Sequence, residues 1–292
     1  GRLVGAHEQH QCQLALADLL HRHERQPVAG RPEHDRDWKA AHRTLRFMEA
    51  FVLQAALLAR RAEALTHQAT PRHPAVGGML ARFDAALPFE LTGDQTLVGD
   101  EIAADLANPW PMHRLVQGEV GSGKTLVALR AMLAVADSGG QSALLAPTEV
   151  LAAQHLRSIA RSLGPELAAQ IMPTLITGQL PAPERRKALL RAAAGQARIV
   201  VGTHALLGEK VSFADLGLVV VDEQHRFGVE QREALRSKGE QPHVLVLSAT
   251  PIPRTVAMTV FGDLDVSTIH ELPAGRAGIE SHVVPLSVRP GW

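Results

Sequence analysis

The chain has 292 residues, of which 46% are hydrophobic and 21% are charged, as is typical of a globular protein with a packed core. Lysine plus arginine equals aspartate plus glutamate at 30 each, so the overall charge gives no sign of a nucleic-acid partner. The single cysteine, Cys12, excludes an internal disulfide and a thiolate zinc site. We find no apolar run of membrane-spanning length and no signal segment, and therefore expect a soluble cytoplasmic protein without a membrane partner.

The first 88 residues are rich in His, Arg, Ala and Leu and contain no convincing strand. Over 39–66 the apolar residues step by three and four, which predicts one long helix with an apolar stripe. Prolines and glycines indicate a loop at 23–38 and a linker at 66–80. We therefore predict a helical segment at the start of the chain, which begins with Gly rather than Met and is expected to be a piece of a longer protein.

From residue 89 onward, short apolar runs alternate with helical stretches. Runs rich in β-branched residues that alternate with helices indicate buried parallel strands in βαβ units. The predicted strands are 115–118, 142–146, 174–177, 198–202, 216–222 and 243–248, and the helices between them include 124–136, 149–163 and 182–194. Ligands of such sheets bind beyond the carboxyl ends of the strands, so we expect the chemistry at that edge.

The run GEVGSGKT, from Gly118 to Thr125, fits the pattern G-x-x-x-x-G-K-[ST] between a predicted strand and a predicted helix. Backbone N–H groups of such a turn surround phosphate oxygens, and Lys124 would reach the β- and γ-phosphates while the Thr125 hydroxyl would ligate Mg²⁺. A chance glycine-rich turn is the alternative interpretation, which the strand–loop–helix context disfavours. The residues predicted to bind the nucleotide here are Gly118, Gly121, Ser122, Gly123, Lys124 and Thr125.

In the run GLVVVDEQHRFG (217–228), a predicted apolar strand is followed directly by two adjacent carboxylates. Beside a phosphate-binding turn, Asp222 would hold Mg²⁺, and Glu223 would orient and deprotonate the attacking water. A solvated acidic turn is the alternative interpretation. Together with Lys124, we predict the two acids as catalytic residues.

Farther along, HVLVLSATPIPRT places Ser248, Ala249 and Thr250 at the end of another predicted strand. Such small hydroxyl residues are often turn formers, but after the two motifs above they resemble the coupling motif of superfamily-two helicases. With PMHRLVQGEVGSGKT before it, the D-E-Q-H-R-F-G run resembles the RecG family, bacterial ATP-dependent helicases that remodel stalled forks and branched DNA junctions. LPFELTGDQ, LLAPTEVLAAQH and VVGTHALL agree, and the resemblance covers nearly the whole chain.

The resemblance implies further roles. Gln95 would read the adenine edge of ATP, with Phe89 nearby, and Gln224 and His225 would link the ATP site to Thr250. Hydroxyl and backbone N–H contacts to phosphate need no net basic charge, which reconciles a neutral chain with a DNA partner. The residues expected to touch the DNA backbone are Thr148, Gly178 and Thr203.

The implied fold is a P-loop NTPase (RecA-like) α/β lobe, a parallel sheet flanked by helices and preceded by a helical segment. Residues 1–88 would connect a wedge (OB-fold) domain to the first RecA-like lobe, residues 89–292. A second RecA-like lobe would supply arginines to the transition state, and we find no candidate for it in this chain. The implied cofactors are ATP and Mg²⁺, the implied partner is branched double-stranded DNA, and this partial chain is expected to hydrolyse ATP weakly or not at all alone.

Two alternative functions stay open. A DNA translocase of the transcription-repair coupling factor type usually reads D-E-E-H, so Gln224, together with Ser122, favours the RecG family. A regulatory nucleotide-binding module would switch conformation without turnover, and the nearly intact set of hydrolysis residues disfavours it.

Overall fold

The computed structural model describes residues 32–64, 66–208, 211–222, 241–249 and 264–272. The chain divides into two compact units, Gly1–Ala55 and Ala56–Trp292, of which the second contains the sheet. In the described part of the chain, every helix is too short or too polar to span a bilayer.

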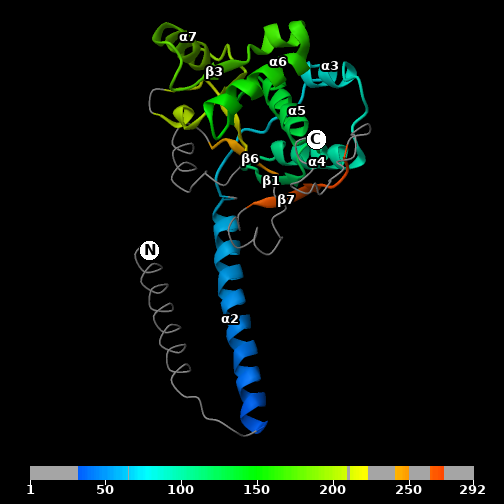
Figure 1. The fold of residues 1–292 in the computed structure, drawn as a ribbon, viewed down its shortest axis with the longest axis vertical. Coiled ribbons are helices and arrows are strands. Elements are labelled where there is room, and N and C mark those ends of the chain that lie inside the picture. Colours follow the sequence, from blue (N-terminus) through cyan, green and yellow to red (C-terminus); the bar gives the residue numbers. More distant parts are fainter. Residues whose placement is uncertain (1–31, 65, 209–210, 223–240, 250–263, 273–292) are drawn as a thin grey trace, which may run out of the picture. The chain divides into compact units, whose positions relative to one another are not determined.

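Helix α2 (Pro32–Ala64) is the long helix predicted over 39–66, and it is continuous (Figure 1). It begins at Pro32, so the predicted loop at 23–38 is wrong for its last seven residues. Proline is tolerated in a first helical turn because that turn needs no N–H from it. Phe47 and Phe51, one turn apart, stack with ring centroids 6.3 Å apart and both are exposed.

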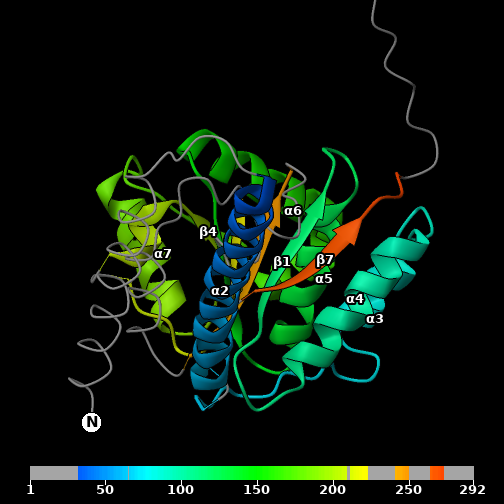
Figure 2. The same ribbon diagram turned by 90° about the horizontal axis from the view of Figure 1, so that it is seen from below.

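All seven strands of the sheet are parallel, in the order β3-β4-β2-β5-β6-β1-β7. The six predicted strands are confirmed as β1 (His113–Gly118), β2 (Gln141–Leu145), β3 (Thr174–Ile176), β4 (Ile199–Gly202), β5 (Leu216–Asp222) and β6 (His243–Ser248). The seventh strand, β7 (Asp265–Ile269), was not predicted. Figure 2 shows it beside β1, next to helix α4 (Gly93–Leu106).

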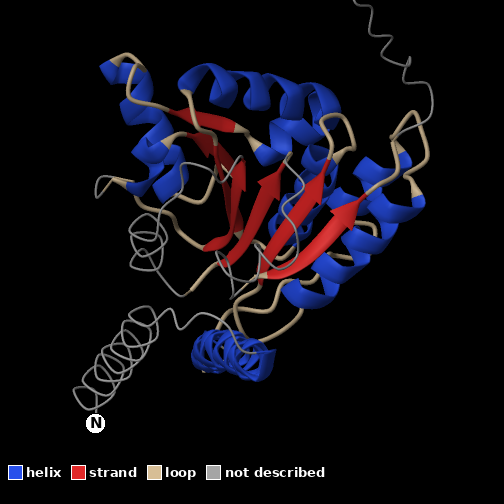
Figure 3. Ribbon diagram, turned by 60° about the horizontal axis from the view of Figure 1, so that its bottom comes forward, coloured by secondary structure: helices blue, strands red, loops and turns tan. Residues whose placement is uncertain are grey.

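Helices cover both faces of this sheet, as Figure 3 shows. On one face pack α3 (Met79–Ala85), α4, α5 (Lys124–Asp137) and α6 (Glu149–Ile171). On the other lie α7 (Ala182–Ala193) and the short 3-10 helix η1 (His204–Leu207). Helix α6 is broken at Gly164, which has a φ of 68° and stands before Pro165. Its first segment therefore ends at residue 163, as predicted from the sequence. The parallel α/β lobe is thus confirmed.

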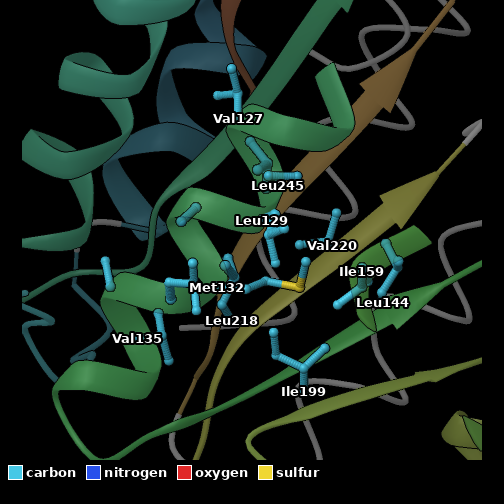
Figure 4. Packing of buried hydrophobic residues seen from close by; sticks show 14 of the residues in the cluster. Val127, Leu129, Met132, Val135, Leu144, Ile159, Ile199, Leu218, Val220 and Leu245 are labelled. Atoms are coloured by element: carbon cyan, nitrogen blue, oxygen red, sulfur yellow. The ribbon is translucent and has the colours of Figure 1, made fainter. Parts of the chain in front are cut away.

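Helix α5 lies at the centre of the larger core. Its Leu129, Met132 and Val135 are buried against side chains from β2, β4, β5 and β6, among them Leu144 and Val220 (Figure 4). Consecutive strand residues enter the cores on opposite faces, which is why these strands read as unbroken apolar runs. Each such side chain contributes about 1.5–3 kcal/mol on burial. The helix that follows the phosphate-binding turn is therefore held firmly.

The predicted linker at 66–80 is irregular as far as residue 78, before α3 begins, and it packs against the lobe through Arg72. Its guanidinium donates to both carboxylate oxygens of Asp215, at 2.7 and 2.5 Å, and this contact holds the pKa of the Asp215 carboxyl below its usual range. A β-carbon at Gly140 or Gly217 would lie 2.7 or 2.8 Å from the guanidinium group, so both sites need glycine for this close approach. This segment therefore packs on the lobe in an ordered conformation.

The residues just before the predicted lobe boundary at 88 pack in the same way. Asp137, the last residue of α5, accepts the backbone N–H of Met79 at 2.6 Å, and thereby fixes the start of α3. Phe83 on α3 is 1% exposed within the larger core. Residues before the predicted boundary at 88 therefore also contribute to the core of the lobe.

His243, the first residue of β6, is a buried titratable group of the lobe, 1% exposed. Its Nδ1 accepts the Met112 N–H at 3.0 Å, and its Nε2 lies 3.3 Å from the carbonyl oxygen of Thr70, to which the neutral ring donates. Burial lowers the pKa of His243 from its usual 6.5 to about 4. The imidazole is therefore neutral in the folded protein at pH 7.

This burial predicts a pH dependence of stability. The unfolded chain binds a proton at His243 near pH 6.5, whereas the folded chain binds it only near pH 4. The contribution of the neutral imidazole to the free energy of unfolding is therefore fully present above pH 6.5 and is lost as the pH falls to 4. Relative to His243→Asn, whose amide oxygen can still accept the Met112 N–H, the wild type should lose about 3 kcal/mol over this window. Urea unfolding between pH 7 and 4 measures the difference. His73→Asn, at an exposed site, is the control, and equal slopes for wild type and His243→Asn would contradict the prediction.

Candidate nucleotide-binding site

The turn between β1 and α5 is shaped by glycines in left-handed conformations. Gly121 and Gly123 have φ values of 87° and 89°, a region that other residues rarely adopt. Lys124 then opens α5 and its Nζ donates back to the carbonyl oxygens of Gly118 and Glu119, at 2.5 and 2.7 Å. The turn therefore wraps around the lysine ammonium group, which stands at the start of the helix.

This turn fits a phosphate group. No side chain caps the N-terminus of α5, so the first helical turn, which includes the half-buried Thr125, presents its N–H groups and the positive end of the helix dipole. A β-carbon at Gly123 would collide with the side-chain amide of Gln95, so the turn has no space for a larger residue there. The hydroxyl of Ser122 is buried without a hydrogen-bond partner among the described residues.

The strand register brings three predicted site residues to one edge of the sheet. In the paired strands β1, β6 and β5, Gln117 lies opposite Ser248, and Leu247 lies opposite Asp222. The phosphate-binding turn, the last residue of β6 and the acid that ends β5 are therefore level with one another. Ser248 is buried, whereas Asp222 is partly exposed.

The carboxylate of Asp222 meets a histidine that the sequence analysis did not single out. Nε2 of His155, on α6, lies 2.6 Å from Oδ2 of Asp222, and the two side chains are 15% and 19% exposed. A signal was present in the sequence. His155 follows Ala152 by three residues and precedes Ile159 by four, so it lies on the buried face of a predicted helix, where a polar residue needs a partner.

Gln95 supports the phosphate-binding turn from α4. Its Oε1 accepts the backbone N–H of Thr92 at 3.1 Å in a capping box, and its Nε2 donates to the carbonyl oxygen of Ser122 at 2.8 Å. The side chain is 1% exposed, whereas Phe89 is 53% exposed. The adenine contact assigned to both residues stays a prediction.

The start of α4 is also joined to the end of β7. Asp94 accepts the backbone N–H groups of Glu271 and His270, at 3.0 and 2.7 Å, and these two contacts hold the pKa of its carboxyl below its usual range. In return the Asp94 N–H donates to the Glu271 carboxylate at 3.2 Å. The helix that carries Gln95 is thus anchored at the same edge of the sheet.

The predicted DNA contacts lie along the other half of this edge. Thr148 follows β2 and caps α6, Gly178 follows β3, and Thr203 follows β4 and is 2% exposed. Glu149 joins two of these loops, because its carboxylate accepts the Gly178 N–H at 3.0 Å. The structure therefore separates the predicted nucleotide and DNA residues onto neighbouring halves of one edge. The predicted Glu223, Gln224, His225 and Thr250 lie outside the described residues.

Comparison with known proteins identifies the family. The DEAD/DEAH box helicase family matches residues 95–259. ATP-dependent DNA helicase RecG of Mycobacterium leprae is 50% identical over 273 residues, which cover 89% of this chain and 36% of that protein. The RecG of Bacillus subtilis is 52% identical over 205 residues, covering 70% of this chain and 30% of that protein. The chain thus spans about a third of the length of the curated relatives it matches.

The solved structures agree. The structure of RecG bound to a three-way DNA junction is similar to this chain with a TM-score of 0.73 and 40% sequence identity, over 84% of this chain and 32% of that one. Both curated relatives are named ATP-dependent DNA helicases. The chain belongs to the DEAD/DEAH box helicase family, and within it to the RecG-like sequences.

Proposed function

We propose that this chain is the nucleotide-binding part of an ATP-dependent DNA helicase that acts on branched DNA such as stalled forks and Holliday junctions, in recombination and repair. The observation that carries the proposal is the juxtaposition, on a RecG-like sequence, of the turn around Lys124 with the acid Asp222 at one sheet edge. The relatives are named DNA helicases, and one of them binds a three-way junction, which supports the choice of substrate.

The donor set suits Mg-ATP. The turn offers backbone N–H groups and one ammonium group to phosphate, while Thr125 and Asp222 offer a hydroxyl and a carboxylate, the oxygen ligands that Mg²⁺ prefers. Bound ATP and Mg²⁺ would supply the phosphoanhydride and the charge that neutralises its oxygens. Lys124 would hold the β- and γ-phosphates, and Glu223 would orient the attacking water and accept its proton.

Gln95 has hydrogen-bonding capacity for an adenine in addition to its structural contacts. Its amide has two N–H donors and two acceptor lone pairs, and Ser122 and Thr92 use one of each. Because these partners require an oxygen at one end and a nitrogen at the other, they fix the orientation of the amide. The remaining donor and acceptor would match the acceptor N7 and donor N6 of adenine, which requires that nucleotide binding uncover the side chain, 1% exposed here.

We also propose the remaining assignments. Residues 1–88 would be a connecting segment, with 66–88 packed on the lobe, and 89–292 the first RecA-like lobe. A second RecA-like lobe and a wedge domain would complete the protein, which the length of the relatives supports. Thr148, Gly178 and Thr203 would contact DNA phosphates without base readout, which requires that the Gly178 N–H leave Glu149 and that the buried Thr203 become exposed when DNA binds. A cytoplasmic, bacterial location would follow from action on DNA.

The first experiment tests the site with the purified chain, measuring ATP binding and Mg-ATP turnover with and without forked DNA. Lys124→Ala removes the charged contact to phosphate and should weaken ATP binding about 10- to 100-fold. The matched control is Lys187→Ala, which removes an exposed lysine from α7 and should bind ATP like the wild type. Equal affinities for Lys124→Ala and wild type would exclude the proposed phosphate site.

Glu223→Gln tests hydrolysis separately from binding. An amide cannot accept the proton of the attacking water, so turnover in the protein that carries both lobes should fall by about 10² or more while ATP affinity is kept. Single-turnover kinetics with forked DNA, beside equilibrium binding, measure both quantities. Unchanged turnover would instead favour a nucleotide-binding module that works without hydrolysis.

Base choice tests the role of Gln95. The wild type should bind ATP at least about tenfold more tightly than GTP, because guanine presents two acceptors, O6 and N7, to the oriented amide. Competition against a fluorescent ATP analogue measures the ratio. Equal affinities for ATP and GTP would show that Gln95 serves the turn and not the base.

A further inference from the structure

We infer that His155 is a positioning residue for Asp222: its Nε2 holds one carboxylate oxygen, so that the other is presented to the metal. This inference rests on the proposed function, since it concerns the proposed metal ligand. The motifs assign His155 no role: its helical spacing marks it as a buried polar residue, and the fold supplies its partner.

The contact has the geometry of a fixed hydrogen bond. Nε2 of His155 and Oδ2 of Asp222 are 2.6 Å apart, and both side chains are more than four-fifths buried. A carboxylate can only accept, so Nε2 carries the proton and donates it. Among the hydrogen bonds of the described residues, this is the contact that the Asp222 side chain makes. A carboxylate held in this way keeps its second oxygen in one direction.

Both elements that carry the pair pack into the larger core. Asp222 ends β5, whose central residues are fully buried, and His155 stands between the buried Ala152 and Ile159 on α6. Neither backbone can shift without disturbing the larger core, so the pair is set by packing rather than by the ligand. Metal-binding groups in proteins are commonly oriented by such outer contacts, and losing one costs about 10- to 100-fold in metal affinity or activity.

The experiment measures binding of a fluorescent ATP analogue by the purified chain as free Mg²⁺ is raised. His155→Asn is too short to reach Asp222, and should raise the Mg²⁺ concentration for half-saturation about tenfold or more. His155→Gln places an amide N–H near the position of Nε2, and should stay within about threefold of the wild type. All variants should bind the analogue equally in EDTA and unfold at similar temperatures. His73→Asn, at an exposed site, is the matched control.

Asp222→Asn separates this inference from the proposed function. If Asp222→Asn raises the Mg²⁺ concentration for half-saturation and His155→Asn does not, the positioning role is excluded and the proposed metal site stands. If His155→Asn and His155→Gln raise this concentration equally, the loss is due to packing and not to the Nε2 hydrogen bond, and the inference is again excluded. If neither Asp222→Asn nor His155→Asn changes the Mg²⁺ dependence, the proposed metal ligand itself is wrong.

Discussion

Parallel strand pairing decides where the chemistry of this chain can lie. Because all seven strands run in the same direction, every loop that follows a strand starts from one edge of the sheet. Strands β1, β6 and β5 lead to the nucleotide residues, and β2, β4 and β3 lead to the proposed DNA contacts. The pairing of β5 with β2 makes the two sets neighbours. The strand order thus makes the proposed nucleotide residues and the proposed DNA residues neighbours without mixing them.

Helix α6 belongs to both halves of this edge. It starts at the cap residue Thr148, beside the loop that Glu149 holds, and two turns later it carries His155 to the carboxylate of Asp222. Its first segment has no break before Gly164, so Glu149 and His155 lie on one continuous helix. Helix α6 therefore connects the proposed DNA loop to the proposed metal ligand directly.

Local patterns predicted the features that depend on neighbours in sequence. The turn around Lys124 and six strands follow from spacing and from β-branched runs. Strand β7 was missed because DVSTI has few apolar residues and pairs only at the end of the sheet. The contacts of His155 and Arg72 join residues 67 and 143 positions apart, so only the fold could reveal them. The roles of Glu223 and Thr250 rest on sequence alone.

The contact of Arg72 with Asp215 bears on where the packed lobe begins along the chain. A polypeptide cut at residue 89 would keep every motif of the nucleotide site. It would nevertheless leave Asp215 without its guanidinium, open a gap above Gly140 and Gly217, and remove Phe83 from the core. The stretch that completes the packing of the lobe is therefore longer than the stretch that carries the motifs, and it includes an arginine that no motif contains.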